Sequence, residues 1–224
     1  MKLGTFCTLA IICVLTGCST PVAPPAIVLP DTVLGISMNR TKEDFIPTGD
    51  QISIGVILSE NTQTNLTYLR QYHNSAGTGF GKNLLVESIR DAYISTSDPH
   101  LAVDWLKASL RREFGQVKEY PDVLSLKAAK PDILVVVDFR FQLITSRNSE
   151  IKANVAAHFY DRSYNHLGTA KGSDEKILSP IWAGNKRTEE IVSDINEQKN
   201  VQISALQKFD RSLKDLLAHK SDKF

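Results

Sequence analysis

Residues 131–143 read PDILVVVDFRFQL and give the strongest strand signal in the chain. Ile133 to Val137 is continuously apolar, which is typical of a strand covered on both faces. Beyond Val137 the apolar residues Phe139, Phe141 and Leu143 alternate with polar residues, so only one face of the strand remains apolar. The stretch therefore predicts a central strand of a sheet.

Two more strands and a helix are expected after this stretch. Apolar residues alternate from Ile151 to Phe159, a turn signal follows at residues 163–165, and a third strand is expected at about residues 166–173. A helix is expected from about residue 199 to residue 219, with Ile195 in an earlier segment, and its apolar seam comprises Leu206, Phe209, Leu213 and Leu216. Four large apolar groups do not stay in water, so this helix packs on a partner or on its own sheet. We expect the sheet, because three strands precede the helix and need a cover.

The N-terminal half predicts one strand and two helices. Residues 52–58 alternate as a strand does, residues 59–79 are polar and typical of a loop with a short strand at 66–69, and a helix is expected over about 80–95. A second helix is expected between Asp98 as its N-cap, followed by Pro99, and Gly115 just past its end. Its buried stripe is Val103, Leu106, Leu110 and Phe114, and residues 116–120 predict a short strand.

This order of elements predicts an α+β fold, in which a mixed or mostly antiparallel sheet has its helices packed on one side. With 42% hydrophobic residues the chain has enough apolar material for a real core. We expect a single domain over residues 50–224. Five prolines between Pro21 and Pro47 predict an irregular tether over residues 18–49.

The first eighteen residues hold all three cysteines of the chain, Cys7, Cys13 and Cys18. Lys2 precedes an apolar run from Phe6 to Leu15, which has the length of a signal-peptide core and is too short to span a membrane. The run ends in Leu15-Thr16-Gly17-Cys18. This sequence resembles the lipobox of bacterial lipoproteins: a branched aliphatic residue, a small residue, Gly or Ala, then Cys.

The lipobox resemblance implies that residues 1–17 are a signal peptide and that lipid on Cys18 anchors the protein to a membrane. One acyl chain gives only marginal binding, so such anchors carry two or three chains. In the same family an Asp after the cysteine favours the inner membrane. Ser19 stands there, which implies the outer membrane, facing the periplasm, with the inner membrane as the alternative.

The order of elements carries a second resemblance, through residues 101–117, residues 131–137 and the hairpin that follows. A lipobox, a Pro-rich tether and this domain are similar to the YajG-like lipoproteins, the activators of penicillin-binding proteins, and the curli-secretion family with its TolB-amino-terminal-like domain. These families share no catalytic residues. The resemblance implies binding to another envelope protein.

Several patterns resemble catalytic or metal sites without meeting their requirements. The glycine-rich residues 77–83, GTGFGKN, lack the first glycine and the final Ser or Thr of a phosphate-binding loop. Two Ser-x-x-Lys runs begin at Ser149 and Ser173, but both fall beside strands, where a serine nucleophile and its lysine separate. His158, Asp161 and His166 fit no standard metal spacing. We therefore predict no cofactor, no metal and no catalytic residue.

The remaining candidates are contact residues. Trp182 and Tyr164 are loop aromatics that suit an interface, and Gly79 and Gly81 suit a partner carboxylate. Without residues 1–17 the chain has 25 basic and 25 acidic residues, so nucleic acid is not expected as a partner. The outer face of the second helix, with Lys107, Arg111 and Arg112, is interpreted as solvated. The sequence favours a non-catalytic adaptor or assembly component of the envelope; the alternative is a periplasmic hydrolase.

Overall fold

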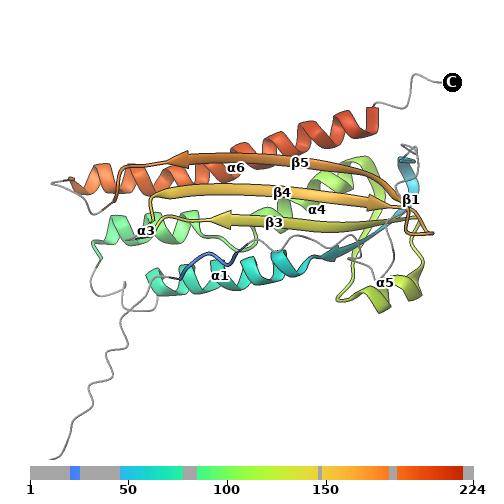
Figure 1. Cartoon of the computed structure of the whole chain (residues 1–224), viewed down its shortest axis with the longest axis horizontal. Coiled ribbons are helices and arrows are strands. Elements are labelled where there is room, and N and C mark those ends of the chain that lie inside the picture. The colour runs from blue at the N-terminus through green and yellow to red at the C-terminus, as the bar shows by residue number, and fades with distance from the viewer. Residues whose placement is uncertain (1–20, 26–45, 78–84, 146–147, 182–185, 219–224) are drawn as a thin grey trace, which may run out of the picture.

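The computed structural model describes residues 21–25, 46–77, 85–145, 148–181 and 186–218. Within these ranges a five-stranded sheet has the strand order β2-β1-β3-β4-β5 (Figure 1). The elements follow one another as β1 (Gly49–Leu58), α1 (Glu60–Gly77), α3 (Glu87–Thr96), α4 (Leu101–Glu113), β2 (Phe114–Glu119), α5 (Val123–Ala129), β3 (Ile133–Gln142), β4 (Glu150–Tyr160), β5 (His166–Ile177) and α6 (Thr188–Ala218).

The sheet is mixed, and β3 lies at its centre. β1 runs parallel to both β2 and β3, with Val56 opposite Val135. β3, β4 and β5 form an antiparallel meander in which Val136 lies opposite His158. The predicted strand at residues 131–143 is therefore the central strand, and the α+β fold class with a mixed sheet is confirmed.

Four helices, α1, α3, α4 and α6, share one core with the inner face of the sheet. In Figure 1 α1 and α6 run along the long axis of the molecule beside β3, β4 and β5. The alternation predicted for β4 is confirmed by side chains that are at most 2% exposed, namely Ile151, Ala153, Val155, Ala157 and Phe159. Each large side chain buried in this way contributes about 1.5–3 kcal/mol.

Helix α6 covers its own sheet, as expected. Three residues of its predicted seam are buried, and the fourth, Leu216, packs against the same core. A Cβ atom on Gly172 of β5 would collide with the backbone of Ala205 and Phe209. The helix backbone therefore lies directly on β5 at this glycine, with no room for a side chain between them.

The start expected for this helix was wrong. α6 has 31 residues and begins at Thr188, so Ile195 belongs to it and is fully buried. Gln198 and Gln202 are buried on the same helix and bind Thr96 on α3. Buried polar residues break the apolar periodicity of α6 before residue 205, which is why the pattern indicates a shorter helix.

The loop expected at residues 59–79, with a short strand at 66–69, is also wrong, because Glu60–Gly77 forms α1. The reason lies in two fully buried polar residues, Thr62 and Asn65. They occupy the inner face of the helix, where an apolar residue is expected, so the helical pattern is hidden in the sequence.

Thr62 and Asn65 bind the edge of β3 beyond the end of β1. The Thr62 hydroxyl accepts a hydrogen bond from Phe139 N at 2.9 Å and donates one to Val137 O at 3.0 Å. The Asn65 side-chain amide accepts from Phe141 N at 3.0 Å and donates to Phe141 O at 2.9 Å. Side chains of α1 thus take the place of a neighbouring strand, and we call this set of bonds the α1 ladder.

The next two helices keep their predicted faces but not all of their ends. α3 spans Glu87–Thr96, and the earlier part of the expected helix lies partly outside the described residues. α4 begins at Leu101, while Asp98 accepts a hydrogen bond from His100 N at 2.9 Å. Gly115 does not follow the helix as a cap. It lies in β2, where a Cβ would collide with the backbone of Asp50.

A short helix, α5, lies on the other face of the sheet and was not expected from the sequence. It packs in a second, smaller core with Ile57, Leu126, Leu134, Val136 and Tyr160. Because α5 covers this end of β3, the run from Ile133 to Val137 is buried on both faces, as its composition predicts.

Candidate functional site

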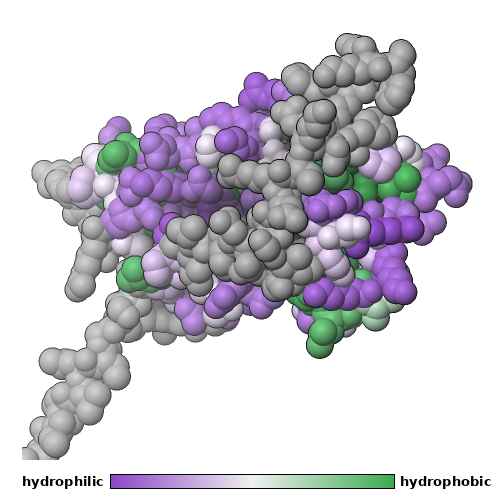
Figure 2. All heavy atoms as spheres, turned by 45° about the vertical axis from the view of Figure 1, so that its right-hand side comes forward, coloured by the Kyte–Doolittle hydropathy of each residue, from purple (hydrophilic) through white to green (hydrophobic). Residues whose placement is uncertain are grey.

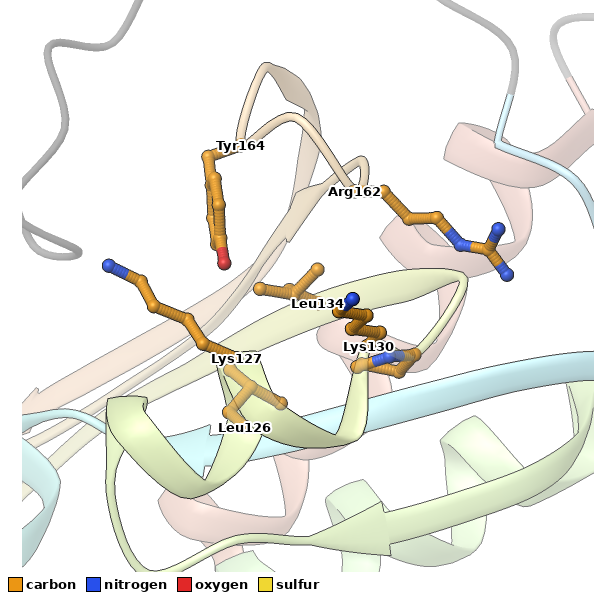
Figure 3. A pocket seen from close by; sticks show the side chains of 7 residues that line it. Leu126, Lys127, Lys130, Leu134, Arg162 and Tyr164 are labelled. Atoms are coloured by element: carbon orange, nitrogen blue, oxygen red, sulfur yellow. The ribbon is translucent and has the colours of Figure 1, made fainter.

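A hollow opens between α5 and the turn that joins β4 to β5. Its volume is about 190 Å³, and it is lined by Leu126, Lys127, Lys130, Pro131, Leu134, Arg162 and Tyr164. Figure 3 shows the Tyr164 ring on one wall and the α5 side chains on the other, while the Arg162 side chain extends away from Tyr164 at the rim. The hollow thus combines an apolar floor with cationic side chains.

The floor is positioned by the close approach of α5 to β1. The Asp122 side chain caps α5 by accepting a hydrogen bond from Ser125 N at 2.7 Å, and this bond holds the pKa of Asp122 below its usual value. Leu126 is fully buried. A Cβ on Gly55 of β1 would collide with Leu126 and Pro131, so only glycine at position 55 lets the helix sit this low.

Two residues that line the hollow have a left-handed backbone conformation. In the described part of the chain only Lys130, with φ 50°, and Tyr164, with φ 66°, are non-glycine residues with positive φ. This conformation costs an ordinary side chain roughly 1–2 kcal/mol, and glycine adopts it without that cost. Both strained residues keep side chains that line the same hollow.

The Tyr164 turn is held by Asp161 and Asn165. The Asp161 carboxylate accepts hydrogen bonds at 2.8 Å from both the backbone and the side-chain amide of Asn165. The turn brings the Tyr164 ring beneath Lys127, whose Nζ lies 5.2 Å from the ring centroid. An ammonium group at this distance from an aromatic ring is attracted to the ring face.

The three cations of the hollow differ in their surroundings. Arg162 forms an ion pair with Asp132. Hydrogen bonds from the hydroxyl and the N–H of Ser53, and then Arg162, hold the pKa of Asp132 below its usual value, so the pair stays charged. Lys130 makes no ion pair with any described residue. An arginine paired at one edge keeps further N–H donors for a ligand.

The histidines considered as metal ligands lie beside this site, on β4 and β5. His158 Nδ1 and His166 Nε2 both bind the Thr169 hydroxyl, at 3.1 and 2.9 Å. The carboxylate of Asp161, the third candidate, accepts hydrogen bonds from Asn165. Within the described ranges no three histidine, cysteine or acidic residues are grouped as metal ligands. Burial is the main cause that lowers the pKa of His158; the charge of Asp138 opposes it by raising the pKa, and the neighbouring His166 adds a smaller lowering effect.

Of the predicted contact residues, the structure places Tyr164 in the hollow. Trp182, Gly79, Gly81 and the lipidation residue Cys18 lie outside the described residues. Tyr160, the last residue of β4, is only 2% exposed and belongs to the smaller core.

Two of the three cationic residues on the predicted outer face of α4 form ion pairs within the protein. Lys107 pairs with Glu119 of β2, and Arg112 pairs with Asp210 of α6 at 2.9 Å. Arg111 is exposed. These ion pairs tie α4 to its neighbours in the fold.

The residues of the hollow that the sequence did not indicate include Lys127 and Lys130. They lie on and after α5, which has only seven residues and one buried position, Leu126. Such a helix is too short to show a periodic stripe. The sequence signals that could have indicated this helix are Asp122, which caps its start, and Pro131, which follows its end.

Comparison with known proteins finds only distant similarities to solved structures. No family model matches the chain, and no curated protein matches it. The PelC dodecamer from Paraburkholderia phytofirmans is similar over 74% of this chain and 95% of its own, with 12% identity and a TM-score of 0.32. A minor lipoprotein from Acinetobacter baumannii is similar over 78% of this chain and 96% of its own, with 11% identity and a TM-score of 0.30. At these values neither similarity defines a family or a function for this chain.

Proposed function

We propose that this chain is a lipid-anchored envelope protein that acts by binding another envelope component, without catalysis. One observation carries the proposal: Leu15-Thr16-Gly17-Cys18 stands at the end of an apolar run of signal-peptide length. In the described part of the chain no helix is both long and apolar enough to cross a membrane. Lipid on Cys18 would supply the anchor.

The hollow supports binding as the role of the folded part. Its described lining consists of two lysines, an arginine, a tyrosine and three apolar residues, and it includes no carboxylate or histidine to act as a general base. These groups attract a ligand by charge and by apolar contact. In Figure 2 polar surface dominates the view, and the hydrophobic surface falls into small separate patches. On the face shown, a local site suits the surface better than a broad apolar interface.

Lipid labelling of Cys18 tests the anchor. Cells that express the protein are grown with radioactive palmitate, and the Cys18→Ser variant is compared with Cys13→Ser. Cys13 lies in the apolar run that cleavage removes, so Cys13→Ser should keep the label and the mature size. Cys18→Ser should lose the label and accumulate as precursor. Equal label in the two variants would contradict the proposal.

Membrane fractionation tests the location. Because Ser19 follows the cysteine, the wild-type protein should sediment with the outer membrane on a density gradient. Ser19→Asp should move it to the inner-membrane fraction. A wild-type protein found wholly in the inner membrane would disprove the outer-membrane assignment and leave the anchor intact.

A further inference from the structure

We propose that the hollow between α5 and the β4–β5 turn binds an acidic segment of a partner protein, with an apolar side chain on the floor and a carboxylate at the cationic rim. This inference rests on the proposed binding function and names the chemistry of the partner. It uses residues of the folded domain alone, so its test is separate from the test of the anchor.

The floor fits one apolar side chain. Leu126, Pro131 and Leu134 form it, and the Tyr164 ring stands as a wall. The hollow measures about 190 Å³, and an apolar cavity of roughly 150 Å³ is enough to hold a benzene ring. An aromatic or branched aliphatic side chain therefore fits, whereas a globular surface does not enter.

The rim is cationic on the α5 side. Lys127 and Lys130 reach it from α5 and the residue after the helix, while Arg162 lines the opposite edge with its guanidinium group turned away and paired with Asp132. Among the residues that the structure describes, no acidic one lines the hollow. A carboxylate next to the bound apolar side chain would meet the two lysine ammonium groups, which favours an anion over a neutral group.

The backbone gives an independent reason to assign a site here. Lys130 and Tyr164 adopt left-handed conformations that glycine takes more easily. Lys130 follows α5 at the position where glycine is the usual residue. Strained non-glycine residues cluster where their side chains have a role, and both of these side chains face the same hollow.

A protein segment fits this rim better than a membrane surface. Recognition of an anionic membrane requires clusters of about four to eight basic residues. This site has three, and one of them, Arg162, is paired with Asp132. Without residues 1–17 the chain also balances at 25 basic and 25 acidic residues.

Calorimetric titration tests the chemistry. The probe is a five-residue peptide with a central phenylalanine between two aspartates, capped at both ends, added to the full anchored protein in a neutral detergent. The control peptide has asparagines in place of the aspartates. We expect the acidic peptide to bind and the asparagine peptide to bind at least several-fold more weakly. Equal affinity for both peptides, or no binding of either, overturns the proposal.

Three variants locate the binding. Lys130→Gln should lower the affinity for the acidic peptide roughly two- to fivefold, the usual effect of losing one exposed charge pair. Lys199→Gln removes the same charge from an exposed position on α6 and should leave the affinity unchanged. Lys130→Gly should weaken binding while the melting temperature stays the same or rises, because glycine relieves the left-handed backbone. A lower melting temperature for Lys130→Gly, with binding kept, would make Lys130 a structural residue and refute its role.

Crosslinking in intact cells identifies the source of the carboxylate. A photoreactive phenylalanine replaces Leu124, which is 78% exposed on α5, and in a control it replaces Lys199. The expected product at position 124 is an adduct to a protein segment that carries an acidic residue beside an apolar one. The Lys130→Gln substitution should lower the yield of this adduct. A phospholipid adduct, or the same product from position 199, overturns the inference. Loss of peptide binding in a labelled, anchored protein refutes the site alone, and absence of label at Cys18 refutes the anchor alone.

Discussion

The α1 ladder predicts that one buried amide stabilises the joint between α1 and the sheet. We would replace Asn65 by leucine, which has a similar size and no polar atoms. In the native protein the Asn65 side chain satisfies both the N–H and the C=O of Phe141. Asn65 is fully buried, so the variant leaves two buried backbone groups without partners.

The magnitude follows from those two groups. Each orphaned buried donor or acceptor costs about 1–3 kcal/mol, so the pair costs about 2–6 kcal/mol. Burying the leucine side chain returns about 2 kcal/mol. We therefore expect the free energy of unfolding to fall by about 2 kcal/mol, and by no more than about 4 kcal/mol, in Asn65→Leu.

Urea unfolding followed by far-ultraviolet circular dichroism measures this change. Gln71→Leu is the matched control, because it also replaces a side-chain amide by leucine, at an exposed position of the same helix, where surface substitutions shift stability by about 0.5 kcal/mol or less. If Asn65→Leu unfolds at the same urea concentration as Gln71→Leu, then α1 does not complete the edge of β3 and the ladder is refuted.

Three other predictions concern the core and its titration. Gly172→Ala should lower stability by about 1–3 kcal/mol, because the new methyl group collides with the α6 backbone, while Ser173→Ala, at an exposed site, should not; equal melting temperatures would contradict the close approach. Burial lowers the pKa of His158 in the folded protein, so on acidification the unfolded chain takes up the proton of His158 at a higher pH than the folded protein does. The contribution of neutral His158 to the free energy of unfolding should therefore be fully present above about pH 6.5 and should be lost as the pH falls through and below that value. His158→Gln should flatten this dependence between pH 8 and pH 5, and an unchanged slope would refute the role of His158. Leu110→Ala and Val135→Ala should each cost about 2–4 kcal/mol in urea midpoint measurements, and a neutral result at both would exclude them from the core.

The sequence predicted the strands better than the helices because the strands carry uninterrupted apolar patterns. β3 buries its continuously apolar residues 133–137 and then the alternating Phe139 and Phe141, and β4 buries its alternating residues from Ile151 to Phe159. The helix α1 was hidden because Asn65 performs a hydrogen-bonding role at a position where periodicity requires an apolar residue.

The candidate site was predicted only in part for a different reason. Tyr164 stood out as a loop aromatic, and the structure places it in the hollow. Lys127 and Lys130 come from a segment far along the chain from Gly55, and the packing of Leu126 on that glycine lets α5 lie close to the sheet. A single sequence shows neither this long-range contact nor the left-handed backbone at Lys130.

The strand order also determines when the domain can assemble. β1 has its two partners in β2 and β3, which begin at Phe114 and Ile133, so β1 finds no partner among the described residues that precede Phe114. The meander β3-β4-β5 and the helix α6, in contrast, follow one another closely in the chain and form with a small loss of loop entropy. We expect this C-terminal part to fold first and β1 to join last. A chain that crosses a membrane N-terminus first would then stay unfolded until its second half has emerged, and the segment nearest the proposed anchor would complete the sheet.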